Sequence, residues 1–224
     1  MNGYGSQAMA LRNLGADFET WRVVEFDKYA VASYNAIHGT DYPAIDINDV
    51  SAEDLGIVDR QHFTYLLTYS FPCTDLSIAG RMAGMSEDSG TRSSLLWQVK
   101  RILTECQDNL PQILVMENVP AIHNGQNMPD FRKWLDFLES LGYSSYMQDL
   151  NAWDFNLAQS RERTFVVSLL GDYNYKFPEI IDDLDFCIED YFEDLTEEQA
   201  LQLVVKSDKA LDLLVKLDEQ GKLE

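Results

Sequence analysis

The sequence is poor in basic residues and in cysteine. It has 17 Lys and Arg against 38 Asp and Glu, a formal net charge of −21 over 224 residues. Because Lys and Arg neutralise the phosphates in DNA binding, this charge argues against a chain that holds DNA by electrostatic attraction alone. The three cysteines, Cys73, Cys106 and Cys187, are widely spaced and suggest neither a disulfide framework nor a metal site. We therefore expect a reducing, cytoplasmic location and no bound metal.

Long apolar runs are also missing from the sequence. No segment has the length and apolar character of a membrane span, and the first residues lack the pattern of a signal peptide. We therefore expect no membrane partner. With 46% hydrophobic residues the chain can bury a substantial core, and one main domain is the expected number.

A cysteine follows the first strongly β-like segment of the chain. Residues 63–69 are rich in β-branched and aromatic side chains, which predicts a buried strand. Pro72 cannot donate a backbone hydrogen bond and ends that strand. Cys73 then lies at the carboxyl edge of the sheet, where open α/β sheets bind their ligands. A thiol in this position is a candidate nucleophile; a small core side chain is the alternative for a lone cysteine.

Two more apolar segments carry charged side chains at one end. Residues 112–116 predict a second strand and residues 164–170 a third. The polar residues beside them are Glu117, Asn118, Gln159, Arg161 and Arg163. A carboxylate and two guanidinium groups can thus converge with the thiol on one pocket. Turn chemistry and a solvated strand start are the alternatives for these motifs taken singly.

Together these motifs resemble those of the DNA (cytosine-5)-methyltransferases, over residues 1 to about 170. The matching catalytic motifs are Pro72-Cys73, Glu117-Asn118-Val119 and Gln159-x-Arg161-x-Arg163. The sequence also resembles the cofactor motifs of that family, at Gly3-Tyr4-Gly5, Glu25-Phe26 and Asp46-Ile47. Motifs in family order make the resemblance specific, whereas a lone Gly-x-Gly is a weak signal.

The resemblance implies a role for each catalytic residue. Cys73 would add to C6 of cytosine and so load electron density on C5, and Glu117 would hydrogen-bond N3 and the exocyclic amine. The two arginines of the third motif would hold the base carbonyl and nearby phosphates. Asn118 and Gln159 would lie on the substrate side. Because a stacked base is out of reach, the target cytosine would have to be flipped out of the duplex.

The resemblance also implies S-adenosylmethionine as the cofactor, beginning with the glycine loop. Gly3 and Gly5, with Tyr4 between them, would let the backbone approach the cofactor closely. Residues 6–14 predict the helix that follows this loop.

Further cofactor contacts are implied downstream. Residues 20–24 predict a strand that ends at Glu25, an acid suited to binding ribose hydroxyls. Phe26 would lie against the adenine ring. The remaining cofactor residues implied by the resemblance are Asp46, Ile47 and Pro72. An ordinary loop acid is the alternative for Asp46.

The sequence departs from the family pattern at both ends. The family has a strand before the glycine loop and, after the third catalytic motif, a target recognition region. We therefore expect an α/β, Rossmann-like methyltransferase fold with a mostly parallel sheet that lacks this first strand and the recognition region. Residues 1–170 are expected to form the partial catalytic domain. Residues 75–90, which contain three glycines, are expected to form a mobile loop beside Cys73.

Residues 171–224 form an acidic segment that is expected to be helical. They contain 16 acidic and 5 basic residues, whereas residues 1–170 contain 22 and 12. Residues 188–195 look helical, and Thr196 is an expected N-cap with Gln199 in the capping-box position. A last helix from near Ser207 carries an apolar stripe, for which packing within the chain and docking of a partner both remain open.

The predicted function is transfer of a methyl group from S-adenosylmethionine to C5 of cytosine in double-stranded DNA. A restriction-modification or phage modification system is the expected setting, and a second polypeptide that supplies the recognition region is an expected partner. Two alternatives remain open. One is an RNA cytosine-5 methyltransferase, and the other is an inactive fragment that acts only as an interaction partner.

Overall fold

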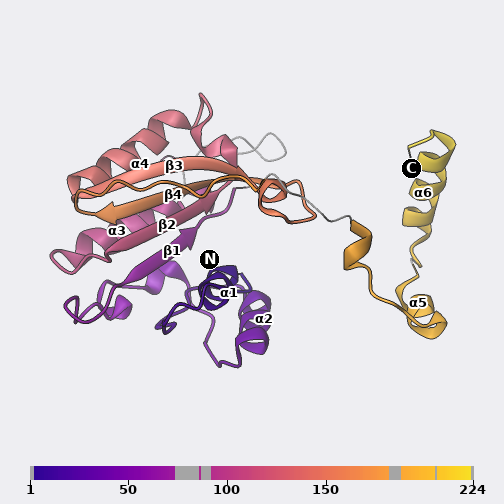
Figure 1. Ribbon diagram of the computed structural model, residues 1–224, viewed down its shortest axis with the longest axis horizontal. Helices are drawn as coiled ribbons and strands as arrows, with labels where there is room; N and C mark the ends of the chain where they lie inside the picture. Colours follow the sequence, from indigo (N-terminus) through magenta and orange to yellow (C-terminus); the bar gives the residue numbers. More distant parts are fainter. Residues whose placement is uncertain (1–2, 74–85, 87–91, 182–187, 205, 223–224) are drawn as a thin grey trace. The chain divides into compact units, whose positions relative to one another are not determined.

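The protein is described by a computed structural model that covers residues 3–73, 86, 92–181, 188–204 and 206–222. The chain divides into two compact units, Met1–Asp183 and Leu184–Glu224. The first unit holds the sheet and the helices that pack on it, and the second holds two short helices (Figure 1). The expected domain boundary at residue 170 precedes this division and stays a prediction.

Four strands form one mixed sheet in the first unit. They are β1 (Leu66–Ser70), β2 (Ile113–Asn118), β3 (Tyr143–Asn151) and β4 (Glu162–Leu170), in the spatial order β1-β2-β4-β3. β1 and β2 pair in parallel, and β4 is antiparallel to both of its neighbours. The expected α/β class is confirmed. We expected a mostly parallel sheet. Three of the four strands (β1, β2 and β3) do run in the same direction, but two of the three strand pairings are antiparallel because β4 lies between β2 and β3. A short connection returns β3 directly into β4, which requires an antiparallel pair.

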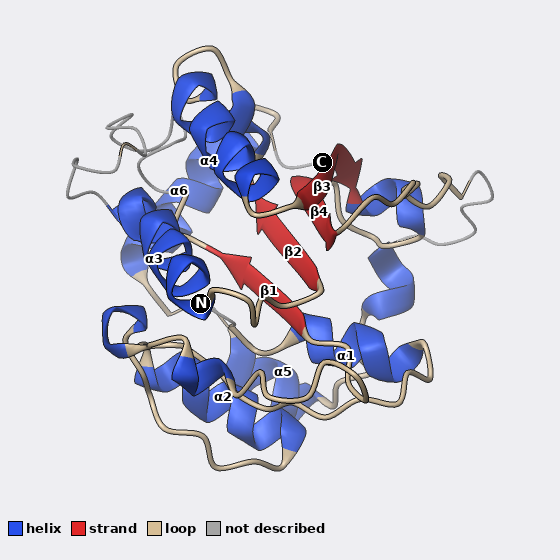
Figure 2. Cartoon of the chain, turned by 90° about the vertical axis from the view of Figure 1, so that its left-hand side faces the viewer, coloured by secondary structure: helices blue, strands red, loops and turns tan. Residues whose placement is uncertain are grey.

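Helices α3 (Leu96–Cys106) and α4 (Met128–Ser140) lie on the same side of the sheet (Figure 2). Their apolar residues recur every three to four positions, so each helix presents one buried stripe to the strands. Trp134 of α4 is fully buried at the centre of this core, with its ring centroid 5.9 Å from that of Tyr69 and 6.5 Å from that of Trp97. This packing fixes the sheet whose carboxyl edge carries the predicted catalytic motifs.

The expected strand over residues 20–24 is wrong. This segment lies outside the four-stranded sheet of the described residues, and it is tied to the chain that follows by a bond from Ile45 N to the Glu25 carbonyl, 2.8 Å long. Val23 is nevertheless almost completely buried, with 1% of its surface exposed. The β-like pattern therefore indicates a buried, extended segment. A buried strand and a packed loop can both have this pattern. Two helices, α1 (Ser6–Asn13) and α2 (Lys28–His38), flank this segment in sequence.

The second unit contains α5 (Glu197–Leu203) and α6 (Asp208–Glu219). The expected capping box is confirmed, because Thr196 Oγ1 accepts from Gln199 N and the Gln199 side chain accepts from Thr196 N. The expected start of the last helix near Ser207 is confirmed, with Ser207 as the N-cap of α6. The expected helix over residues 188–195 is shorter, since a single 3-10 turn spans Ile188–Tyr191. Within the described parts of both units, no helix combines the length and apolar character needed to cross a membrane.

Candidate active site

The parallel pairing of β1 and β2 brings the cysteine and glutamate motifs to one edge of the sheet. Ser70, the last residue of β1, is the register partner of Glu117, and Cys73 follows three residues later. The Asn118 side chain connects the two segments, because its Nδ2 donates to the Phe71 carbonyl at 3.1 Å. Only 3% of Asn118 is exposed, so this hydrogen bond is shielded from water. The edge predicted from the sequence is therefore built, with an amide holding the cysteine segment against β2.

The carboxylate of Glu117 forms an ion pair with Arg163. Arg163 Nε lies 3.0 Å from Glu117 Oε1, and both side chains are about a quarter exposed, at 22% and 30%. The β2–β4 register explains the contact, because Glu117 lies opposite Phe165 and Arg163 is on the same face two residues away. Arg163 Nη1 also donates to the Glu162 carbonyl at 2.6 Å. These contacts fix the orientation of the carboxylate at the sheet edge.

The other two residues of the third motif lie on the connection that enters β4. Arg161 is exposed, and its backbone N donates to Asn151 Oδ1 at 2.9 Å. Gln159 is also exposed, and its backbone N donates to the Leu157 carbonyl at 2.6 Å. Among the described residues, neither side chain forms a hydrogen bond or an ion pair with Glu117. The structure therefore brings Arg163 to the site and leaves Arg161 and Gln159 at its solvent side.

The expected mobile loop over residues 75–90 falls largely outside the described residues, which resume as a continuous segment at Arg92. Cys187 also lies outside them. Cys73 itself is half-buried, and Cys106 is buried in α3. Burial raises the pKa of the Cys106 thiol to about 11, with a smaller contribution from the Glu105 carboxylate. Of the two described thiols, Cys73 alone lies at the sheet edge.

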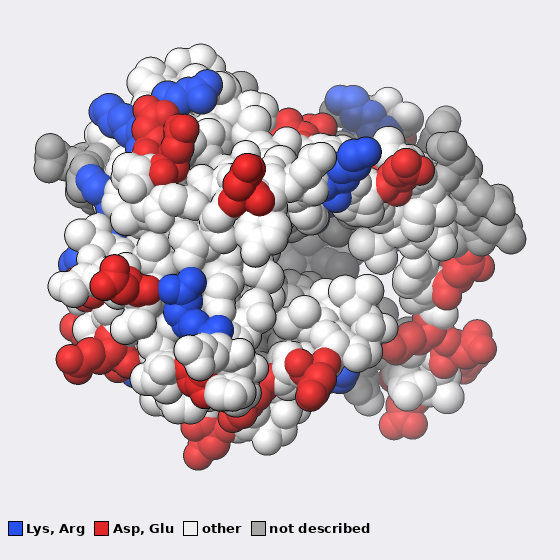
Figure 3. Space-filling view, turned by 60° about the vertical axis from the view of Figure 1, so that its left-hand side comes forward, with Lys and Arg blue, Asp and Glu red and all other residues white. Residues whose placement is uncertain are grey.

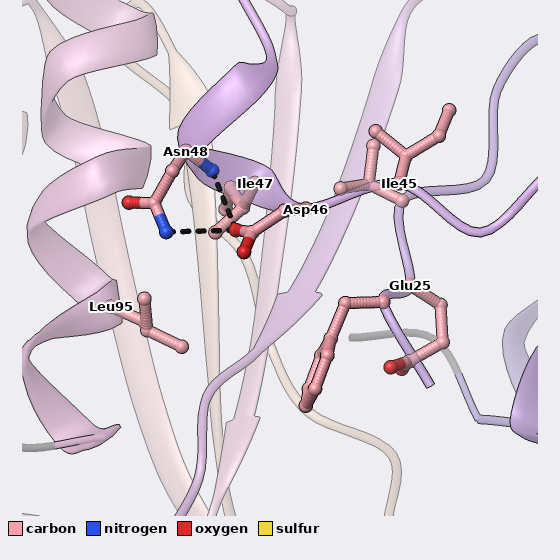
Figure 4. A pocket seen from close by; sticks show the side chains of 8 residues that line it. Glu25, Ile45, Asp46, Ile47, Asn48 and Leu95 are labelled. Carbon is pink, nitrogen blue, oxygen red and sulfur yellow. Dashed lines mark hydrogen bonds between the residues drawn. The ribbon is translucent and has the colours of Figure 1, made fainter. Parts of the chain in front are cut away.

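A pocket gathers four of the residues predicted for the cofactor (Figure 4). It lies between the extended segment that ends at Phe26, the turn that starts at Asp46, and the residue that precedes α3. Its lining residues are Val24, Glu25, Phe26, Ile45, Asp46, Ile47, Asn48 and Leu95. The sequence did not predict Asn48 or Leu95. Gly3, Tyr4, Gly5 and Pro72 do not line this pocket.

Two carboxylates and one aromatic ring define the chemistry of the pocket. Glu25 is 8% exposed, and its Oε1 accepts from Asp27 N at 3.1 Å. Asp46 Oδ1 accepts from both the backbone N and the Nδ2 of Asn48, at 2.9 and 2.8 Å. Phe26 lines the pocket and is 66% exposed, so its ring is accessible to a ligand. Fixed acceptors beside apolar walls suit a flat ligand that carries hydroxyl and amine donors.

The glycine loop is shaped by two rings of α2. Gly5 has φ 81°, and a Cβ on it would lie 2.4 Å from Tyr34 Cε2 and 2.6 Å from His38 Nε2. Only glycine fits this position, because both the backbone conformation and the space exclude a side chain. His38 Nε2 lies 3.0 Å from the Tyr4 carbonyl. Tyr34 and His38 could not be predicted from the sequence, because they belong to no motif and lie on an ordinary helix.

No group of three or more His, Cys, Asp or Glu in the described ranges is arranged to hold a metal ion.

Comparison with solved structures identifies the fold. The chain matches the Entamoeba histolytica methyltransferase EhMeth with a TM-score of 0.69 and 16% identity, over 88% of this chain and 59% of that chain. It matches the S. pombe Dnmt2 methyltransferase with a TM-score of 0.61 and 21% identity, over 88% of this chain and 54% of that chain. At these identities the likeness establishes a methyltransferase fold.

The sequence comparisons establish the family. The family model for C-5 cytosine-specific DNA methylases matches residues 1–219, so the chain belongs to that family. The orphan methyltransferase M.SssI of Spiroplasma monobiae is 40% identical over 156 residues, which cover 68% of this chain and 39% of that protein. The type II methyltransferase M2.ScrFI of Lactococcus lactis subsp. cremoris is 31% identical over 225 residues, 79% of this chain and 62% of that protein. The matches thus span less than two thirds of the length of either relative. They confirm the resemblance drawn from the motifs.

Proposed function

We propose that this chain is the catalytic part of an enzyme that methylates C5 of cytosine in DNA, with S-adenosylmethionine as the methyl donor. The observation that supports the proposal is the meeting of residues from the three predicted catalytic motifs at one sheet edge. Asn118 links the Cys73 segment to β2, and Glu117 pairs with Arg163 at 3.0 Å. Family membership and the methyltransferase fold support the same reading.

In the proposed reaction the Cys73 thiolate adds to C6 of a flipped-out cytosine. A bond forms between sulfur and C6, and the electron pair of the C5–C6 double bond becomes available at C5. A proton held between Glu117 and N3 offsets the negative charge that develops on the ring, and a Glu117 oxygen accepts from the exocyclic amine. When bound, S-adenosylmethionine supplies an electrophilic methyl group. Removal of the C5 proton by a base and departure of the Cys73 thiolate then restore the aromatic ring and the free enzyme.

The arginines take two different tasks in this proposal. Arg163 orients Glu117 through the ion pair and directs its remaining donors toward the base carbonyl. Arg161 is exposed at the entrance to β4 and contacts a phosphate of the DNA backbone. Asn118 and Gln159 lie on the substrate side, where Asn118 keeps the cysteine segment in place.

The pocket around Glu25 and Asp46 binds the nucleoside part of the cofactor in this proposal. Glu25 accepts from the ribose hydroxyls, and Asp46 accepts from the adenine amine. Phe26 and Ile47 pack against the adenine ring, an arrangement supported by the apolar walls of the pocket. The Gly3-Tyr4-Gly5 loop and Pro72 approach the remainder of the cofactor from outside this pocket.

A second polypeptide completes the enzyme in this proposal. The support is electrostatic: the net charge of −21 opposes an encounter with DNA. Figure 3 shows Asp and Glu spread over one face of the molecule, with Lys and Arg lying between them rather than in one basic patch. We propose that the partner carries the basic recognition region and that residues 171–224 lead toward it. A cytoplasmic restriction-modification or phage modification system is the proposed setting.

The test is transfer of a tritium-labelled methyl group from S-adenosylmethionine by the full chain. The acceptors are a duplex with one mismatched cytosine, the fully paired duplex, and an RNA of the same sequence. We expect label on the mismatched DNA, where flipping is easiest, and none on the paired duplex at physiological salt. Label on the RNA alone would contradict DNA as the substrate. Robust turnover on the paired duplex would contradict the need for a second polypeptide.

A further inference from the structure

His38, the last residue of α2, contacts both the glycine loop and α1. Its Nε2 lies 3.0 Å from the Tyr4 carbonyl, and its Nδ1 lies 2.9 Å from Nη2 of Arg12. Its ring stacks on that of Tyr34, with centroids 4.2 Å apart and planes inclined by 26°. Tyr34 is 1% exposed, so the imidazole rests on a rigid support. The loop, the first helix and the second helix thus meet at this one side chain.

These contacts select one form of the imidazole. A guanidinium can only donate, so Nδ1 must be the acceptor of the bond from Arg12. A carbonyl can only accept, so Nε2 must carry the hydrogen that reaches Tyr4. The neutral ring with hydrogen on Nε2 satisfies both partners. A protonated ring would present a second N–H and a positive charge to the Arg12 guanidinium.

We propose that neutral His38 is a positioning residue that holds the Gly3-Tyr4-Gly5 loop ready for the cofactor, and that its protonation releases the loop. The assignment of the loop to cofactor binding rests on the proposed function, whereas the positioning of the loop by His38 does not. The clash distances at Gly5 support it, because the loop backbone lies against the Tyr34 and His38 rings with no room for a Cβ. A shift of the imidazole away from Arg12 is therefore transmitted to Gly5.

His38 is faced by a guanidinium from α1 and by the Tyr34 ring from its own helix. Among the described residues, Arg12 is the charged group in contact with His38, and a guanidinium keeps its charge. The stacked Tyr34 ring also meets Tyr42 edge-on, at 5.9 Å between centroids. Burial raises the pKa of Tyr42, with smaller contributions from Tyr34 and Glu19, so this phenol stays neutral. Protonation of the imidazole would remove the acceptor that Arg12 uses, so we expect cofactor affinity to be lower below the pH range in which histidines in general titrate than above it.

The variant test is calorimetric titration of the full chain with S-adenosylmethionine at about pH 8 and about pH 5.5, on either side of that range. We expect the wild type to bind roughly five- to tenfold more weakly at the lower pH, because the loss of about one hydrogen bond has an effect of this size. His38→Gln keeps an amide donor for Tyr4 but does not titrate, so it should lose most of this pH dependence. The matched control is His62→Gln, since His62 contacts Asp59 on an exposed segment, and it should behave as the wild type. Equal pH dependence in all three proteins would overturn the proposal.

A cofactor-free measurement keeps the inference separate from the proposed function. The ¹⁵N NMR shifts of the imidazole report which ring nitrogen carries hydrogen in the wild-type chain. We expect Nε2 protonated and Nδ1 bare at about pH 8, the neutral range of histidine, and a shift of the Gly5 amide resonance as the ring titrates. A bare Nε2, or a Gly5 amide that ignores the titration, would contradict the positioning role. Failure of the wild type to bind S-adenosylmethionine at about pH 8 would instead contradict the proposed function.

Discussion

The Glu117 carboxylate and the Arg163 guanidinium meet at 3.0 Å across the antiparallel pair of β2 and β4. The two residues come from motifs far apart in the sequence, and strand register alone brings them together. In the proposed reaction Glu117 binds the cytosine base, and the planar guanidinium of Arg163 holds the Glu117 carboxylate in position. The register of β2 and β4 therefore sets the position of the group that binds the base.

Arg163→Lys tests whether the fork, and not just the charge, is needed. Lysine keeps the positive charge but cannot present parallel donors to Glu117 and the base. We expect single-turnover methyl transfer to a mismatched duplex to slow by about 100-fold, the usual effect of removing one oriented donor. Arg132→Lys, on the exposed side of α4, is the matched control and should transfer at the wild-type rate. If Arg163→Lys transferred the methyl group as fast as Arg132→Lys, the guanidinium of Arg163 would have no role in the reaction.

Asn118→Asp tests the link between the cysteine segment and β2. The substitution keeps the size of the side chain but replaces the Nδ2 donor with an oxygen that faces the Phe71 carbonyl. Because the site is buried, we expect a loss of about 1–3 kcal/mol in the free energy of unfolding, measured by urea denaturation. Asn109→Asp makes the same charge change on an exposed position and should leave stability within about 0.5 kcal/mol of wild type. Equal stability of the two variants would show that the hydrogen bond from Asn118 to the Phe71 carbonyl does not stabilise the fold.

Glu25→Ala tests the ribose contact. Removal of a charged hydrogen-bond acceptor should weaken the binding of S-adenosylmethionine by roughly 1.5–3 kcal/mol, measured by calorimetry. The control is Glu139→Ala on the exposed end of α4, which should bind as the wild type does. Unchanged affinity in Glu25→Ala would take this residue, and with it the pocket assignment, out of the account.

Much of the candidate site could be predicted from the sequence because its motifs stand at the ends of strongly apolar strands. Cys73, Glu117 and Arg163 were placed in this way, and Glu25 and Asp46 do share a pocket. The antiparallel direction of β4 was not predicted, since an apolar strand pattern carries no information on direction.

Residues off the strands could not be found by the same reasoning. Asn48 acts through a local turn with Asp46, and His38 acts through contacts with segments distant in the sequence. The failed strand at residues 20–24 has a related cause. The burial of Val23 explains the strand-like pattern of this segment. A strand also needs a neighbouring strand to which its backbone can hydrogen-bond, and the sequence pattern does not show whether one is present.

The Cys106 thiol should make stability fall at alkaline pH. Its pKa is raised by burial from 9.0 to about 11 in the folded chain. A raised folded-state pKa means that the contribution is fully present below pH 9.0 and is lost as the pH approaches about 11. Urea denaturation across this window should show a steeper loss for the wild type than for Cys106→Ala. The buried Tyr69 and Tyr143 phenols, whose pKa values burial also raises, contribute to both proteins. Parallel curves would contradict the assignment.

The most direct test of the account is covalent trapping at Cys73. The full chain is incubated with S-adenosylmethionine and a duplex whose single mismatched base is 5-fluorocytosine, because fluorine at C5 prevents elimination of the thiolate. Mass spectrometry of the intact complex and its peptides then locates the bond. The account predicts one DNA adduct on Cys73, present in Cys106→Ser and absent in Cys73→Ser. An adduct that survives Cys73→Ser, or no adduct with the wild type, would contradict it.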